Sequence, residues 1–163
     1  MAMATMNILF KNVWEKDLDL KERVKKFWND LNALPDNVSI EDRARQLVFV
    51  AVDEDKVIGV TTAHRARIPK LNNNYFYNFR TLVHPRYRIP GLVDKLAVLT
   101  RDFLETLYIS GQSDCIGLIT VIENEQLKQE RREAVFPSTK MFFIGQTKAG
   151  HHIRLYYFKG AKI

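Results

Sequence analysis

The most informative segment of the chain is Phe79-Arg80-Thr81-Leu82-Val83-His84-Pro85-Arg86-Tyr87-Arg88-Ile89-Pro90-Gly91-Leu92-Val93. It begins as an apolar strand, continues as a loop marked by prolines, and opens into a long helix. The first N–H groups of a helix lack an intrahelical partner and point, with the positive end of the helix dipole, at whatever precedes them. A phosphate group is the usual ligand at such a place. The stretch therefore predicts a pyrophosphate-binding loop.

Pro90 and Gly91 favour this interpretation for different reasons. Proline suits the first helical position, because its missing N–H would have had no partner there. Gly91 has no side chain and therefore lets a ligand approach the backbone closely. The amides predicted to remain free for a phosphate are those of Arg88, Ile89, Gly91, Leu92 and Val93.

The same stretch resembles motif A of the GNAT superfamily, the acyl-CoA-dependent N-acyltransferases. That motif reads roughly V-x-P-x-x-[RQ]-x-x-G-x-[GA]. Its matching positions in this chain are Val83, Pro85, Arg88 and Gly91. Val93 stands where the family has Gly or Ala, and Pro90 stands where it often has a basic residue.

The composition predicts a single globular domain over residues 1–163. Hydrophobic residues make up 46% and charged residues 27% of the chain, as in an ordinary soluble protein. No apolar run reaches the length of a membrane span, and no signal peptide pattern opens the chain. The single Cys115 excludes an internal disulfide and fits a reducing cytoplasm. Because it lies in an apolar run, we expect a buried, inert thiol rather than a nucleophile.

The net charge of +6 favours polyanionic partners, a class that includes nucleic acid, coenzyme A and acidic surfaces. Basic residues concentrate beside the predicted phosphate loop, at Arg65, Arg67, Lys70, Arg80, Arg86 and Arg88. A solvated basic face is the alternative interpretation, and charge alone does not choose between them.

Hydrophobic periodicity predicts the elements of the first half of the chain. They are a strand over 7–13, helices over 17–31 and 39–46, a hairpin of strands 47–52 and 56–63, a loop over 69–74 and a strand over 75–84. Ser39, with Asp42 three residues later, marks the start of the second helix.

The second half starts with a helix that runs from Gly91 to about Tyr108, and its apolar face is wide enough to be buried against a sheet. The elements that follow are a strand over 115–122, a charged helix over 123–134 and a hairpin of strands 141–147 and 152–158. This order resembles the GNAT layout over nearly the whole chain. It implies an α/β (α+β) fold with a mixed, mostly antiparallel central sheet of six to seven strands and helices on both faces.

The resemblance also implies where acetyl-CoA, the co-substrate, would bind. Its pyrophosphate would lie on the loop and helix start described above, and its pantetheine arm would lie along the backbone of Leu82, Val83 and His84, like an added strand. The amide of Val83 would polarise the thioester carbonyl. Asn124 falls where the family commonly keeps an Asn that contacts the coenzyme. Phe143-Ile144-Gly145 is similar to the family's G-F-x-x-x-G ending, without its first Gly.

The general base and acid do not match the family. Many relatives carry a Glu on the strand read here as 75–82, where this chain has no carboxylate and Tyr77 falls near that position. Glu123 is the nearest acidic candidate, and its ordinary interpretation is an acid at a helix start. His84 is a further candidate base. Arg131 stands where the family has its acidic Tyr, and the nearest hydroxyl groups are those of Ser138 and Thr139.

The leading hypothesis is an acetyl-CoA-dependent N-acetyltransferase in which an amine of unknown identity attacks the thioester directly. The first alternative is a module with the same fold that binds acyl-CoA or a partner without turnover. The second is a basic nucleic-acid-binding domain, which the sequence disfavours. No metal is expected, because His151 and His152 have no cysteine or carboxylate pair nearby.

The expected partner is a small-molecule or peptide amine, with a homodimer left open, in the cytoplasm and without a membrane. Acceptor specificity should come from the early helices, the 65–74 loop and the terminal hairpin.

Overall fold

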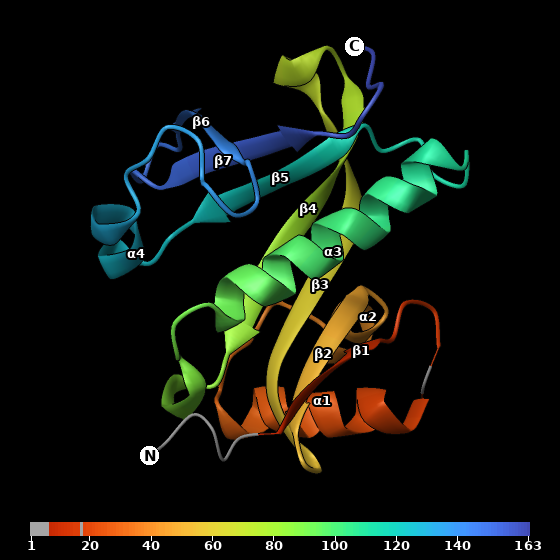
Figure 1. Cartoon of the computed structure of the whole chain (residues 1–163), viewed down its shortest axis with the longest axis vertical. Coiled ribbons are helices and arrows are strands. Elements are labelled where there is room, and N and C mark those ends of the chain that lie inside the picture. The colour runs from red at the N-terminus through yellow and green to blue at the C-terminus, as the bar shows by residue number, and fades with distance from the viewer. Residues whose placement is uncertain (1–6, 17) are drawn as a thin grey trace. The chain divides into compact units, whose positions relative to one another are not determined.

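The structure, a computed structural model, describes residues 7–16 and 18–163 and divides into two compact units. Unit 1 joins the described residues up to Ala63 to Arg80–Thr100, and unit 2 joins His64–Phe79 to Arg101–Ile163. Each unit is described by itself. Strands β3 (Lys56–Ile68) and β4 (Asn74–Val83) and helix α3 (Leu92–Ile109) pass through both units (Figure 1). The single domain over residues 1–163 stays a prediction.

The strands form a mixed, mostly antiparallel sheet, as predicted. The seven strands are hydrogen-bonded in the order β1-β2-β3-β4-β5-β7-β6. The β4–β5 pair is parallel, and the pairs β1–β2, β2–β3, β5–β7 and β6–β7 are antiparallel. The remaining elements are β1 (Ile8–Asn12), α1 (Leu18–Asp30), α2 (Ile40–Ala44), β2 (Leu47–Asp53), β5 (Gly117–Ile122), α4 (Glu125–Glu130), β6 (Phe142–Gln146) and β7 (His152–Tyr157).

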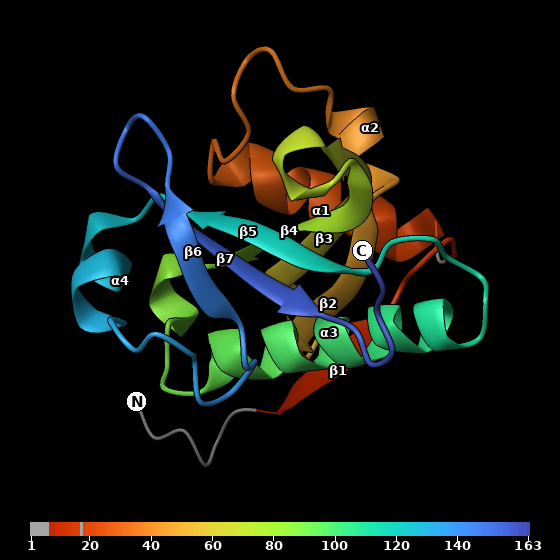
Figure 2. The same cartoon turned by 90° about the horizontal axis from the view of Figure 1, so that it is seen from above.

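In unit 1, helices cover both faces of the β2–β3 hairpin (Figure 2). The apolar side of α1, with Val24 and Trp28, packs with Val50 and Val60 of the hairpin into one buried cluster. The first half of α3 lies on the opposite face. It approaches so closely that a Cβ atom built on Gly59 would lie 3.0 Å from Leu96 Cδ1. Only glycine fits at such a contact without displacing its neighbour.

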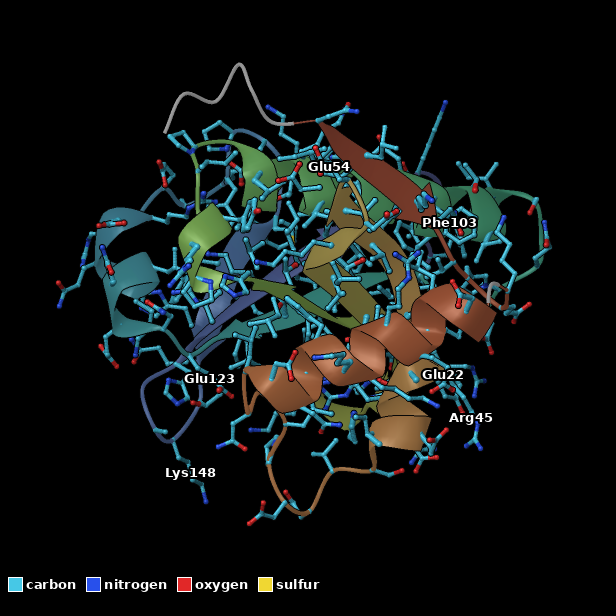
Figure 3. The ribbon with its side chains drawn as sticks, turned by 90° about the horizontal axis from the view of Figure 1, so that it is seen from below. Glu22, Arg45, Glu54, Phe103, Glu123 and Lys148 are labelled. Carbon is cyan, nitrogen blue, oxygen red and sulfur yellow. The ribbon has the colours of Figure 1, made fainter. Side chains whose placement is uncertain are left out.

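The short helix α2 begins where the sequence predicts. Ser39 is its N-cap, and the Ser39 hydroxyl accepts a hydrogen bond of 3.2 Å from the Asp42 amide. Lys25 on α1 links the two helices, because its ammonium group donates to Glu22 of α1 at 2.9 Å and to Glu41 of α2 at 2.8 Å. Figure 3 labels Glu22 on α1 and Arg45 at the end of α2.

Unit 2 is built on β5 and β7, which pair in register from Gly117↔Tyr157 to Ile122↔His152. Phe76, Ile116, Ile119 and Leu155 form its buried cluster. Cys115 is fully buried, as predicted, and burial raises the pKa of its thiol to about 11. Within the described part of the chain, no helix is long and apolar enough to cross a membrane.

Two predicted element boundaries are wrong. Strand β3 continues past Ala63 to Ile68, where exposed and partly buried side chains alternate as on a strand with one wet face. The helix predicted over 123–134 spans only Glu125–Glu130, because the following segment is held as a loop by the buried Arg154. The helix predicted over 17–31 is α1, and Asp17 lies outside the described residues.

Candidate functional site

The predicted phosphate loop lies wholly in unit 1, between the end of β4 and the start of α3. His84 caps the first turn of this loop, a 3₁₀ turn over Pro85–Tyr87, and its Nδ1 accepts a hydrogen bond of 3.1 Å from the Arg86 amide. The Tyr87 hydroxyl donates to Asp53 Oδ2 at 3.0 Å, which ties the loop to the β2–β3 hairpin. The His84 contact thus holds the first turn of the loop against the end of β4, and the Tyr87 contact holds it against the β2–β3 hairpin.

The segment from Arg88 to Leu92 is a pair of turns rather than the first turn of a helix. Arg88 has φ −77° and ψ 62°, and the Ile89 amide donates to the Tyr87 carbonyl at 2.8 Å, as in an inverse γ-turn. The Leu92 amide then donates to the Ile89 carbonyl at 3.3 Å across Pro90 and Gly91, and Gly91 has φ +86°. Proline followed by a glycine with positive φ is the signature of a type II turn.

The prediction that Pro90 occupies the first helical position is therefore wrong. Helix α3 starts at Leu92, and its first intrahelical acceptor is the Gly91 carbonyl, which the Lys95 amide meets at 2.9 Å. A residue with φ +86° cannot be helical, so the helix cannot begin before Leu92. The Pro-Gly dipeptide, a turn signal in its own right, would have indicated this from the sequence.

The turns also change which amides are free. The predicted free amides of Ile89 and Leu92 are paired within the loop. The amides of Arg88, Gly91 and Val93 have no hydrogen-bond partner among the described residues. Three donors in a short, glycine-containing turn at a helix start still offer an anion a place to bind.

The backbone of β4 faces its two edges alternately. The His84 amide donates to the Ile58 carbonyl of β3 at 2.7 Å, so it is already used within the sheet. Backbone groups of a strand alternate in direction along it, so those of Leu82 also face β3 and those of Val83 face the opposite edge. Of the three residues predicted to line the pantetheine arm, only Val83 offers its amide on that edge.

Positive charge gathers around the loop. The pKa of His84 lies below its ordinary value, first because the ring is partly buried and then because Lys56, Arg86 and Arg88 repel a proton on it. Lys56 also lies over the Tyr87 ring, with its Nζ 5.6 Å from the ring centroid. Burial disfavours a charge of either sign, whereas the repulsion from Lys56, Arg86 and Arg88 shows positive charge beside the loop, which favours an anion such as a pyrophosphate.

Binding of a polyanion at this loop is expected to raise the pKa of His84. In the free protein that pKa should lie below the ordinary value of about 6.5. Because the unfolded chain then binds the proton more tightly, stability should rise with pH across the window between the folded and the ordinary pKa. An NMR titration of the His84 ring, assigned with His84→Gln, measures the pKa with and without coenzyme A. A His84 pKa that coenzyme A leaves unchanged would contradict the placement of its phosphates.

The other candidate catalytic and binding residues lie in unit 2. The Tyr77 hydroxyl donates to Ser113 Oγ at 2.7 Å, so its proton is already engaged. Glu123, labelled in Figure 3, is exposed after the end of β5. Asn124 is the N-cap of α4, and its Oδ1 accepts from the Leu127 amide at 3.0 Å, which leaves its amide group available. Arg131 is the C-cap of the same helix.

The predicted basic residues are distributed over both units. Arg65, Arg67 and Lys70 belong to unit 2, whereas Arg80, Arg86 and Arg88 belong to unit 1. Arg65 is neutralised by Asp114, with bonds of 2.8 and 2.6 Å, and its guanidinium stacks on the Tyr75 ring at 3.4 Å. No group of three or more metal-ligating side chains occurs in residues 7–16 and 18–163.

Acetyltransferases are among the solved structures to which this chain is similar. The putative acetyltransferase yncA from Salmonella typhimurium, solved with acetyl-CoA, is similar with a TM-score of 0.65 and 17% identity, covering 98% of this chain and 97% of its own. NAA60 from Arabidopsis thaliana, solved with acetyl-CoA, has a TM-score of 0.60 and 17% identity, covering 94% and 100%. A GNAT-family acetyltransferase from Streptococcus pneumoniae has a TM-score of 0.55 and 13% identity, covering 93% and 99%.

No protein-family model matches the chain, and no curated protein is similar to it in sequence. The structural similarity extends over almost the whole length of each chain, which confirms the predicted fold class. This protein has the fold of the GNAT acetyltransferases.

Proposed function

We propose that the protein is an acetyl-CoA-dependent N-acetyltransferase that acts on an amine. The observation that carries the proposal is the loop of unit 1. The free amides of Arg88, Gly91 and Val93 lie in a turn beside His84, whose pKa is lowered first by burial and then by the cations around the loop. Two similar structures were solved with acetyl-CoA, which supports the same choice of ligand.

Each part of the loop would have one task. The three free amides and the Arg88 guanidinium would hold the pyrophosphate of the coenzyme, whose bound form supplies an activated acetyl thioester. The Val83 amide, on the edge of β4 that faces away from β3, would donate to the thioester carbonyl and stabilise the charge that develops on its oxygen. The acceptor amine would attack directly, so the protein's main contribution is placement.

The base and the acid stay predictions. Glu123 is the residue we retain as base, acting through water because its carboxylate is exposed. Asn124 would use its free amide group on the coenzyme. We leave Tyr77 out of the mechanism because its hydroxyl donates to Ser113. A homodimer and a cytoplasmic location also stay predictions.

A module that binds acyl-CoA without turnover is the second candidate. It is favoured by Arg131, which stands at the family's acid position and caps α4 instead of offering a hydroxyl group. The two candidates share the phosphate loop and differ only in the chemistry beyond it.

Calorimetry and a thiol-release assay separate these functions. We expect acetyl-CoA to bind in a one-to-one ratio and an amine panel to contain an acceptor that releases coenzyme A above the rate of hydrolysis. Binding without release from any amine would establish the non-catalytic module. Absence of acetyl-CoA binding together with salt-sensitive binding of an oligonucleotide would replace both by the nucleic-acid alternative.

A further inference from the structure

Unit 1 contains a cavity of about 190 Å³ between α1, α2 and the strands β3 and β4. At about 30 Å³ for each water molecule, this volume holds roughly six waters, so a small organic molecule fits. Its wall combines apolar side chains, among them Trp28, Leu34 and Leu82, with the polar side chains of Arg43, Arg80 and Thr62. The predicted phosphate loop contributes none of the lining residues.

Two arginines meet at this cavity without a counter-charge. Arg43 comes from α2 and Arg80 from β4, and neither guanidinium has a hydrogen bond or an ion pair among the described residues. The pKa of Arg43 lies below its ordinary value, first because the group is partly buried and then because Arg80 is close. Two neighbouring guanidinium groups repel each other, and an apolar wall nearby strengthens this repulsion. An anion bound between them would replace the repulsion by attraction to both groups.

Thr62 also lines the cavity, but its hydroxyl group is closed off from it. Thr62 is 3% exposed, and its buried Oγ1 has no hydrogen-bond partner among the described residues. Alternation along the strands places Thr62 with Val60 on one face of β3, and Arg80 with Leu82 on one face of β4. Val60 and Leu82 both pack with the α1 cluster, so Thr62 and Arg80 face the same side. The charge that faces the cavity is therefore that of the two guanidinium groups.

We propose that this cavity binds the carboxylate of a small organic molecule whose remainder is apolar. Two guanidinium groups supply positive charge and N–H donors, which match a carboxylate. The apolar wall distinguishes such a molecule from inorganic phosphate, which has nothing to place against Trp28 and Leu34.

The cavity also identifies the acceptor class, a step that rests on the proposed function. Leu82 immediately precedes Val83, the residue assigned to the thioester carbonyl, and Arg80 lies three positions before it on β4. A carboxylate held by Arg43 and Arg80 would keep the rest of its molecule near that end of β4. The acceptor is accordingly an amine that also carries a carboxylate, such as an apolar α-amino acid.

Calorimetry on the full chain tests the site without any need for turnover. The probes are L-alanine, L-valine and L-leucine, each paired with its carboxamide, together with inorganic phosphate. We expect at least one of the amino acids to bind at least tenfold more tightly than its carboxamide and than phosphate. Equal affinity for each acid and its carboxamide, or tighter binding of phosphate, would overturn the proposal.

Neutral variants locate the binding. Arg43→Gln and Arg80→Gln should each weaken amino-acid binding by about 10- to 100-fold without lowering the melting temperature of the free protein, because each removes a repulsion. Arg45→Gln is the matched control, because Arg45 lies on the same helix end, pairs with Asp42 at 2.7 Å and is outside the cavity (Figure 3). If Arg45→Gln weakens amino-acid binding as much as Arg43→Gln does, the effect comes from the net charge of the protein and the proposed site is refuted.

The thiol-release assay separates this inference from the proposed function. Release driven by the carboxamides as fast as by the amino acids would leave the acetyltransferase intact and remove the carboxylate requirement. Tight binding of an amino acid without release of coenzyme A would support the carboxylate site in the cavity and contradict the proposed acetyltransferase activity.

Discussion

Gly91→Glu abolishes acetyl-CoA binding, with an expected loss of affinity of at least 100-fold. Gly91 is the turn residue whose amide lies free before α3, and a Cβ atom there meets no atom within 4 Å, so a side chain would occupy the space in front of the loop. A carboxylate in that space would lie close to the pyrophosphate. Two like charges 4 Å apart repel by about 4 kcal/mol at an effective dielectric constant of 20, which more than accounts for the loss.

The positive φ of Gly91 requires a matched control. Any other residue at φ +86° strains the backbone by about 1 kcal/mol, so a loss in Gly91→Glu mixes strain with charge. Gly91→Gln carries the same strain and nearly the same volume without the charge. We expect calorimetry to show that Gln costs at least tenfold less affinity than Glu. Equal losses of affinity in the two variants would mean that backbone conformation, and not repulsion of a diphosphate, governs binding. Unchanged affinity in Gly91→Glu would contradict the assignment of this loop to the pyrophosphate.

Arg154→Met is expected to destabilise the fold by about 1.5–3 kcal/mol, the range for losing buried hydrogen bonds to a charged group. Arg154 is 1% exposed, and its guanidinium donates to the carbonyl groups of Glu133 at 2.6 Å, Ala134 at 3.1 Å and Arg131 at 3.3 Å. It also stacks on the Phe136 ring at 3.8 Å. Methionine fills part of the volume and leaves the carbonyl groups of Glu133 and Arg131 without this donor, whereas the Ala134 carbonyl keeps the Phe143 amide at 2.9 Å. Urea unfolding, followed by circular dichroism, measures the change.

Arg132→Met is the control for that variant, because Arg132 lies in the same loop with an exposed side chain. Its expected effect is within about 0.5 kcal/mol, as for most surface positions. A loss below about 1 kcal/mol in Arg154→Met would show that the loop holds its conformation without the guanidinium and that burial of Arg154 is nearly neutral.

Most helices and strands and their order can be predicted from the sequence, because local signals specify them. The apolar run of β2, the Ser39 cap and the wide apolar face of α3 each depend on neighbours within a few residues. The spacing from Val83 to Gly91 predicted a GNAT fold for the same reason, since one strand–turn–helix unit carries the motif. The turn at Pro90 was also readable, from the dipeptide it forms with Gly91.

The tertiary structure alone decided how distant residues meet. Which edge of β4 the Val83 amide faces depends on the pairing of β4 with β3, and no periodicity in one strand reveals its partner. Arg43 and Arg80 are 37 positions apart in the sequence, and each is typical of a solvated surface. The fold brings them to one cavity, because α2 and β4 both contribute to its wall. The sequence around Arg154 predicts an ordinary strand residue, and only the structure shows that the loop after α4 binds its guanidinium group. Ion pairs and hydrogen bonds between residues that are distant in the sequence produce no local sequence pattern from which they could be predicted.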